Sequence, residues 1–186
     1  MISASYYFKK GLSANECAGL VKYALQQQAC NGTIGYGGKQ MEHEMRRSTV
    51  RWLYPYDLNL DWLKARTEYW CLKANAENFG IDTRGFLSWQ FTEYHGCDKS
   101  HYDWHRDDDP YGAPPFERKL SMVVQLSRSK DYEGGLLELD GAEINRELFC
   151  DQGDVIIFRS DQRHRVTQTT SGIRFSLVSW MIGPRT

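Results

Sequence analysis

The sequence predicts a mostly β fold with helices at its N-terminal end. From Gly85 onward, short β-type runs follow one another with turn residues between them, and no helical period interrupts them. Such a succession favours an antiparallel barrel or sandwich over a βαβ fold. Before Gly85, two helices are expected. We therefore expect one domain over residues 1–186, with helical support over about 1–84 and a β-barrel over about 85–186.

The first helix is predicted from its start signal and its periodicity, and the second from the signals at its two ends. Ser13 and Glu16 form the pattern of a capping box. Apolar residues then recur at helical spacing to about Gln28. A second helix is expected from Asp61, as the N-cap, to about residue 78, with Gly80 just beyond its end.

Two loops and one strand complete the predicted frame around the barrel. Residues 31–45 contain four glycines and no consistent period, which indicates a loop that could cover a site. Residues 46–54 alternate with period two and predict a strand. Residues 108–117 contain three prolines, and we expect them to form a second wall of a substrate groove.

The C-terminal part contains six predicted strands. Each is a short run rich in β-branched and aromatic residues, bounded by glycine or polar turn residues. They cover residues 86–94, 120–127, 135–139, 154–159, 164–169 and 174–182.

The composition excludes several classes of protein. Lys and Arg total 23 against 24 Asp and Glu, so a formal charge of −1 does not favour nucleic acid or anionic membrane as a partner of the whole domain. Mean hydropathy is −0.61, and neither a signal peptide nor a membrane span is indicated. The five cysteines are odd in number and widely spaced, which indicates neither a disulfide scaffold nor a zinc knuckle. We expect a cytoplasmic protein.

The segment His101–Asp107 places potential metal ligands at alternate positions. Residues i and i+2 of a strand point to the same face, so an adjacent His and Asp could bind one ion. Two such pairs are present, His101 with Asp103 and His105 with Asp107. Exposed polar alternation would produce the same pattern without a metal.

A later histidine and arginine strengthen the metal hypothesis. His164 lies on a separate predicted strand, and Arg174 and Ser176 follow at i and i+2 on the next. Two His and one carboxylate are the ligand set of non-haem Fe(II) oxygenases. A buried arginine would offer a planar fork for a dicarboxylate, whereas an exposed one would only be a solvated strand residue.

Across about residues 86–183, the chain resembles the Fe(II)/2-oxoglutarate-dependent dioxygenases, in the prolyl 4-hydroxylase-like branch. The matching parts are Tyr94-x-Gly96, Tyr102-x-x-His105-x-Asp107, Leu120-Ser121, Gly134-Gly135-x-Leu137, Gly153–Phe158-x-Ser160-x-x-x-His164-x-Val166 and Gly172-x-Arg174-x-Ser176-x-x-x-Trp180. Tyr102 and Trp104 stand before His105 as they do in relatives, and this favours the later His/Asp pair as ligands.

The resemblance implies a double-stranded β-helix, or jelly-roll barrel, that holds Fe(II) and uses 2-oxoglutarate and O₂ as cosubstrates. Iron would be held by His105, Asp107 and His164. The 2-oxoglutarate site would include Arg174, Ser176, Tyr94 and Gln125, the last standing where relatives often carry Tyr. Tyr102, His101, Asp103 and Trp180 would face substrate or support the ligands. Tyr94 and Tyr102 could instead be packing residues, and His101 and Asp103 solvated ones.

The implied activity is hydroxylation of an aliphatic C–H, with prolyl in a peptide or protein as the first choice. A free amino acid or another small molecule is the alternative substrate. Nucleic-acid demethylation is disfavoured because AlkB-type relatives carry a second Arg six residues after the first, where this chain has Trp180. A non-catalytic jelly-roll module would need an incomplete ligand set. A zinc hydrolase would give Arg174 no role.

Overall fold

Two antiparallel sheets form the body of the protein. The structure is a computed structural model and describes residues 3–33, 44–108 and 115–185. In spatial order the larger sheet contains β1 (Ser5–Phe8), β10 (Val155–Arg159), β7 (Phe116–Gln125), β12 (Thr169–Pro184), β5 (Gly85–His95), β4 (Thr49–Leu53) and β2 (Cys30–Asn31), and β8 (Tyr132–Gly134) pairs with the start of β12. The smaller sheet contains β3 (Arg46–Arg47), β6 (His101–His105), β11 (His164–Val166) and β9 (Leu137–Leu139).

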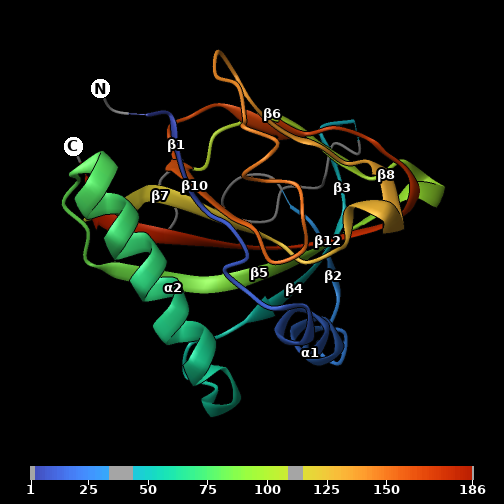
Figure 1. Cartoon of the computed structure of the whole chain (residues 1–186), viewed down its shortest axis with the longest axis horizontal. Helices are drawn as coiled ribbons and strands as arrows, with labels where there is room; N and C mark the ends of the chain where they lie inside the picture. Colours follow the sequence, from blue (N-terminus) through green and yellow to red (C-terminus); the bar gives the residue numbers. More distant parts are fainter. Residues whose placement is uncertain (1–2, 34–43, 109–114, 186) are drawn as a thin grey trace.

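The helices cover the outer face of the larger sheet. Figure 1 shows α1 (Ala14–Ala24) and α2 (Asp61–Ala74) on one side of β5, with β6 of the smaller sheet on the other. Short helical turns at η1 (Leu58–Leu60), η2 (Asn75–Phe79), η3 (Gly96–Asp98) and η4 (Ser129–Asp131) join the longer elements. The predicted class, mostly β with N-terminal helices, is confirmed.

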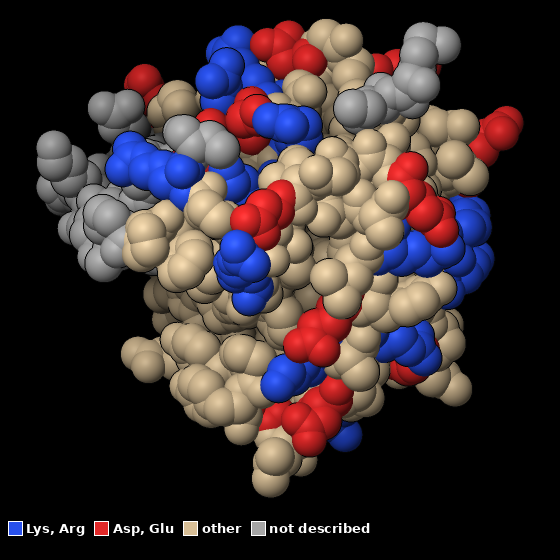
Figure 2. Space-filling view, turned by 90° about the vertical axis from the view of Figure 1, so that its left-hand side faces the viewer, with Lys and Arg blue, Asp and Glu red and all other residues tan. Residues whose placement is uncertain are grey.

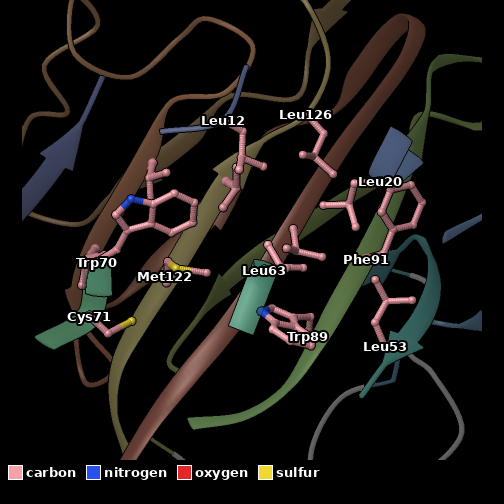
Figure 3. Packing of buried hydrophobic residues seen from close by; sticks show 14 of the residues in the cluster. Leu12, Leu20, Leu53, Leu63, Trp70, Cys71, Trp89, Phe91, Met122 and Leu126 are labelled. Carbon is pink, nitrogen blue, oxygen red and sulfur yellow. The ribbon is translucent and has the colours of Figure 1, made fainter. Parts of the chain in front are cut away.

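Alternating side chains of the larger sheet supply two cores. On β7, Met122 and Val124 pack toward the helices, whereas Val123 packs toward the smaller sheet. On β10, Ile157 packs toward the helices and Ile156 toward the smaller sheet, because successive side chains of a strand point to opposite faces. Figure 3 shows part of the core on the helix side, with these labelled residues: Leu12, Leu20, Leu53, Leu63, Trp70, Cys71, Trp89, Phe91, Met122 and Leu126.

The helix starts follow the sequence signals closely at α1 and less closely at α2. The Ser13 and Glu16 side chains form the predicted capping box of α1. Asp61, predicted as the N-cap of α2, is instead its first residue. The capping carboxylate is that of Asp57, which accepts from the Asn59 backbone N–H at the start of η1. A turn with a wider helical radius, η2, continues α2 and ends at Gly80, whose φ is +62°.

Two predicted strands are divided because the chain changes sheets within them, and a third is shortened by a turn. The segment 46–54 forms β3 in the smaller sheet and β4 in the larger one. The segment 135–139 begins in a turn at Gly134 and Gly135, which have φ of +72° and +58° and separate β8 from β9. The segment 164–169 ends as β11 at Val166 and re-enters the larger sheet as β12. Each division brings residues to the cavity between the sheets.

Within the described ranges, no helix has the length and apolar character needed to cross a lipid bilayer.

Candidate metal centre and cavity

Two short paired strands carry the predicted metal ligands. In the antiparallel ladder of β6 and β11, His105 and His164 are directly opposite partners. Asp107 follows β6, and its backbone N–H donates to the carbonyl of Ser160, which fixes the turn after the strand. The ladder and this turn bring residues 59 positions apart in the chain to one point, the inner face of the smaller sheet.

The three side chains have the geometry of an open metal site. Ligand atoms of His105, Asp107 and His164 all lie within 4.8 Å of one another. His105 Nε2 lies 3.7 Å from Asp107 Oδ1, and His164 Nε2 lies 3.5 Å from Asp107 Oδ2. Two nitrogens and a carboxylate on one face match the set that binds non-haem Fe(II) and leaves other positions open.

Backbone carbonyls fix both imidazoles in the form that binds a metal. His105 Nδ1 lies 2.7 Å from the carbonyl oxygen of Asp103, and His164 Nδ1 lies 2.9 Å from that of Gln162. A carbonyl can only accept, so each Nδ1 carries a hydrogen and each Nε2 is the atom turned toward Asp107. This second hydrogen bond is what metal-binding histidines need for orientation.

Burial and neighbouring charges set the ionisation of the ligands. Burial lowers the pKa of His105 to about 3, helped by the nearby His164, so the ring is neutral at neutral pH. Burial acts to raise the pKa of Asp107, but the electrostatic attraction of the neighbouring His164, His105 and Arg118 outweighs it and lowers that pKa to about 2. The Ser121 hydroxyl also donates to Asp107 Oδ2 at 2.7 Å. A neutral imidazole and an ionised carboxylate are the protonation states that coordinate a metal.

A second group of potential ligands does not form an open site. Donor atoms of Cys150, Asp151 and Asp154 also lie within 4.8 Å of one another. However, the buried Asp154 carboxylate accepts from Lys9 Nζ at 2.8 Å and from the backbone N–H groups of Lys10, Cys150 and Asp151. Its lone pairs are therefore used to tie the end of β1 to the turn before β10.

The metal-ligand group opens into a cavity of about 910 Å³ between the two sheets. This volume is at the upper end of the range for small-molecule sites. The larger sheet contributes Tyr94, Arg174, Ser176 and Trp180 to its wall. The smaller sheet contributes Arg46, Tyr102, Trp104, His105 and His164, and Asp107 follows its strand β6. The lining also includes Thr33, Met45, Trp52, Gln90, Arg106, Asp108, Glu117, Arg118, Val123, Leu137, Arg163, Val166, Val178 and Arg185.

Arg174 is a buried cation with donor capacity left over. The residue is 2% exposed, and its Nε donates to Gln125 Oε1 at 3.0 Å. Its Nη1 is buried and has no hydrogen-bond partner among the described residues. A buried donor without a partner costs free energy unless a ligand supplies an acceptor. The guanidinium therefore fits the carboxylate of a bound dicarboxylate.

Gln125 orients Arg174. Its amide nitrogen donates to the Ser127 carbonyl at 3.2 Å and to the Tyr132 hydroxyl at 2.9 Å, and its oxygen accepts from Arg174. Gln125, predicted to contact 2-oxoglutarate, is not among the described residues that line the cavity and instead contacts Arg174, which does line it. Tyr132, which sequence reasoning missed, completes this chain of hydrogen bonds.

Tyr94, Ser176 and Thr169 surround Arg174. Tyr94 faces Arg174 across β5 and β12, and its ring centre lies 5.5 Å from Arg174 Cζ. Ser176 is 2% exposed and lines the cavity two residues farther along β12. Thr169 Oγ1 is a second buried polar atom with no partner in the described part of the chain. A Cβ at Gly135 would lie 2.7 Å from Thr169 Oγ1 and 3.2 Å from Arg174 Cδ, so glycine keeps this corner open.

The competing His/Asp pair lies outside the metal-ligand group. Both ring nitrogens of His101 lie 2.9 Å from backbone carbonyl oxygens, those of Lys99 and Glu44. The Asp103 carboxylate accepts from the Trp104 backbone N–H at 2.7 Å. His101 therefore ties the segment before β3 to β6.

Tyr102 and Trp180 pack against other side chains that line the cavity. The Tyr102 ring stacks on the His105 ring with centroids 3.4 Å apart. The Trp180 ring contacts the Arg118 guanidinium at 3.7 Å and lies 6.3 Å from the Trp52 ring. Both residues line the cavity, where the sequence predicts substrate-facing or supporting roles.

The predicted loop walls are described only in part. Residues 34–43 of the 31–45 loop and residues 109–114 of the 108–117 loop lie outside the described ranges. The described ends, Thr33 and Met45 of the first loop and Asp108 and Glu117 of the second, line the cavity.

Comparisons with known proteins agree on one family. Residues 89–182 match the family model described as the 2OG-Fe(II) oxygenase superfamily. A PKHD-type hydroxylase of Gloeothece citriformis is 32% identical over 80 residues, which are 43% of this chain and 36% of the relative. One of Alteromonas mediterranea is 36% identical over 62 residues, 33% of this chain and 27% of the relative. The matched part of the chain thus spans about a third of the length of these relatives.

Solved structures show the same fold. A Pseudomonas putida prolyl-4-hydroxylase superposes with a TM-score of 0.73 at 18% identity and covers 99% of this chain and 94% of its own. A viral collagen prolyl hydroxylase from Paramecium Bursaria Chlorella virus-1, solved as a 2OG complex, gives a TM-score of 0.73 at 18% identity over 97% of both chains. The two open sheets therefore form the predicted double-stranded β-helix.

Proposed function

Because the chain belongs to the 2OG-Fe(II) oxygenase superfamily, we propose that it is an Fe(II)- and 2-oxoglutarate-dependent dioxygenase that hydroxylates a prolyl residue in a peptide or protein. The overall reaction converts substrate C–H, O₂ and 2-oxoglutarate into C–OH, succinate and CO₂. The observation that carries the proposal is the buried Arg174, with its unpartnered Nη1, in the same cavity as His105, Asp107 and His164.

Each of these residues has a part in the proposed reaction. His105, Asp107 and His164 would hold Fe(II), which supplies the oxygen-activating chemistry when bound. Arg174 would bind the distal carboxylate of 2-oxoglutarate, with Gln125 fixing its direction. Burial raises the pKa of Tyr94, so its phenol stays protonated and can donate a hydrogen bond in the same corner.

The prolyl substrate is supported by the relatives. The curated relatives are named PKHD-type hydroxylases, and a Trichoplax adhaerens prolyl hydroxylase of the same fold was solved with a hypoxia inducible factor peptide. A free amino acid or other small molecule remains the alternative substrate. A non-catalytic jelly-roll module has less support, because all three residues of the ligand set are present. A zinc hydrolase has less support, because it gives no role to Arg174, which lines the same cavity.

We further propose that residues 1–186 act as one domain in the cytoplasm. β1, near the start of the chain, pairs with β10, and both helices share one core with the larger sheet. All five cysteines are free, which suits a reducing compartment.

Succinate formation tests the activity. Purified protein with Fe(II), 2-oxoglutarate and a prolyl peptide is expected to release succinate and to add one oxygen to the peptide, measured by mass spectrometry. Arg174→Met should raise the KM for 2-oxoglutarate by at least tenfold, because a charge-assisted hydrogen bond is lost. If no succinate forms, even without peptide, and zinc co-purifies tightly, the oxygenase proposal fails.

Iron retention tests the ligand assignment. His105→Ala is expected to lose bound Fe(II) on gel filtration, measured by metal analysis, because the variant lacks one of three ligands. His101→Ala is the matched control and should retain it, since that ring contacts two backbone carbonyls. Loss in the His101 variant alone would reverse the assignment.

A further inference from the structure

The cavity is far more basic than the protein as a whole. The described residues that line it include six arginines, Arg46, Arg106, Arg118, Arg163, Arg174 and Arg185, against three acids, Asp107, Asp108 and Glu117. The chain has a formal charge of −1. The charges of Fe(II) and the 2-oxoglutarate dianion, which the proposed function requires, would cancel each other. Arg163 is paired with Asp140 outside the lining, but the arginines among the described lining residues still outnumber the acids, which favours a second, anionic ligand.

Arg46 is the best-placed arginine for such a ligand. The residue is 4% exposed, although it belongs to a strand of two residues. Its Nε donates to Ser48 Oγ at 2.9 Å and its Nη1 to the Thr33 carbonyl at 3.0 Å. Its Nη2 is buried without a hydrogen-bond partner in the described ranges. Two bonds thus fix the plane of the guanidinium while a third donor is left for an acceptor.

Arg46 stands close to the metal-ligand group and belongs to a different sheet from Arg174. Its Cζ lies 4.3 Å from the centre of the Tyr102 ring, whose centre lies 3.4 Å from that of His105, so the guanidinium is less than about 8 Å from the His105 ring. Arg46 belongs to β3 of the smaller sheet, whereas Arg174 belongs to β12 of the larger sheet. Two buried arginines on opposite walls can bind the anionic groups of two different molecules.

We propose that Arg46 binds a carboxylate of the substrate, so that the enzyme prefers a prolyl group with a carboxylate close to it. This inference rests on the proposed hydroxylase function. The carboxylate could be the α-carboxylate of a C-terminal or free proline, or the side chain of a neighbouring Asp or Glu. A planar guanidinium with a free donor matches either source.

A carboxylate is favoured over the phosphates of a nucleic acid. Phosphate backbones bind to broad basic surfaces. On the face drawn in Figure 2, basic and acidic side chains are interspersed among uncharged ones. The excess of arginine belongs to the cavity, which suits one small anionic group close to the reacting atoms.

Binding of matched acids and amides tests the proposal without any variant. The wild-type protein, loaded with Fe(II) and 2-oxoglutarate with oxygen excluded, is titrated with a short peptide ending in a free prolyl carboxylate and with the same peptide amidated. Internal prolyl peptides with an Asp or Asn neighbour, and free proline, form the other arms. Trp104 and Trp180 line the cavity, so their fluorescence reports binding. We expect at least one acid to bind about tenfold more tightly than its amide.

Variants then assign the preference to Arg46. Arg46→Gln should reduce the ratio of acid to amide affinity to about one, and Arg46→Lys should retain part of it. Arg47→Gln is the matched control, because it removes the same charge from the adjacent residue, which donates to the Asp98 carbonyl and does not line the cavity. Circular dichroism checks that each variant is folded, and the Lys variant tests the role of the charge if the Gln variant unfolds.

Three outcomes would overturn the proposal: equal binding of every acid and its amide, no binding of either, or an unchanged preference in folded Arg46→Gln. Displacement of the acidic peptide by a short oligonucleotide of equal affinity would assign the cavity to phosphates instead. Binding preference and succinate release are separate readouts. If the protein prefers the acid but releases no succinate, the oxygenase proposal fails and the role of Arg46 stands. If it releases succinate without preferring the acid, the oxygenase proposal stands and the role of Arg46 fails.

Discussion

At the scale of single residues, Gln125 shows how a neutral side chain controls a charged one. Every polar atom of its amide is engaged, with Arg174, the Ser127 carbonyl and the Tyr132 hydroxyl as partners. The amide is thus held at both ends, and the oxygen it presents to Arg174 Nε fixes the direction of the guanidinium.

Replacing Gln125 should weaken 2-oxoglutarate binding although the residue itself need not touch the cosubstrate. Gln125→Met removes the acceptor and is expected to raise the Kd of 2-oxoglutarate about tenfold, measured by calorimetry. Gln125→Glu should weaken binding further, because a carboxylate would compete with the cosubstrate for Arg174. Gln152→Met is the control, since Gln152 donates to the Leu126 carbonyl and lines no part of the cavity. An unchanged Kd for Gln125→Met would contradict this role.

The sequence reveals the residues whose spacing is local and misses those assembled by the fold. His105 with Asp107, and Arg174 with Ser176, are visible because they stand two positions apart on strands. Arg46 is not visible, because its burial depends on Thr33 and Tyr102, which are distant in sequence and meet it only in the folded protein. No local pattern could have identified it.

At the scale of elements, one hydrogen bond ties α2 to β5. The Trp89 indole N–H donates to Thr67 Oγ1 at 2.9 Å, and both residues are fully buried. In Figure 3 Trp89 lies beside Leu63 of α2. This contact joins the helix to the strand that carries Tyr94 farther along.

Removing the acceptor should destabilise the protein. Thr67→Val leaves the shape almost unchanged but leaves the indole N–H without a partner, so the free energy of unfolding should fall by about 1–3 kcal/mol, measured by urea denaturation. Thr170→Val, an exposed change on β12, should alter it by less than about 0.5 kcal/mol. In a protein that already carries Trp89→Phe, Thr67→Val should lower the free energy of unfolding by less than it does in the wild type. A cost for Thr67→Val that is unaffected by Trp89→Phe would argue against the hydrogen bond as its cause.

Long elements are predictable here and very short ones are not. The capping box and helical period locate α1, and the runs of β-branched and aromatic residues locate β5, β7 and β10. β1 escapes prediction because its four residues pair with β10, about 150 positions away, and β2 has only two residues. In such cases tertiary contacts, not local preference, decide the structure.

At the scale of the whole molecule, burial divides the cysteines into two classes. Cys17 and Cys71 are buried in the core between the helices and the larger sheet, whereas Cys30, Cys97 and Cys150 are exposed. Burial raises the pKa of both Cys17 and Cys71 to about 12. Only a thiolate reacts readily, so these two thiols should be inert in the folded protein.

Alkylation should therefore distinguish the two classes. At pH 8, iodoacetamide is expected to modify Cys30, Cys97 and Cys150 within minutes, and Cys17 and Cys71 only after denaturant is added. Peptide mapping by mass spectrometry locates each label. The reaction of the core thiols requires unfolding, and their labelling at the rate of the exposed thiols would show that the core opens readily.

The direct opposition of His105 and His164 in the β6–β11 ladder couples metal loading to the integrity of the smaller sheet. An ion bound by both histidines would cross-link β6 and β11, which have five and three residues. Its binding free energy would then add to the stability of that sheet by linkage. Since β3 pairs with β6, loss of the metal would also loosen the wall that carries Arg46.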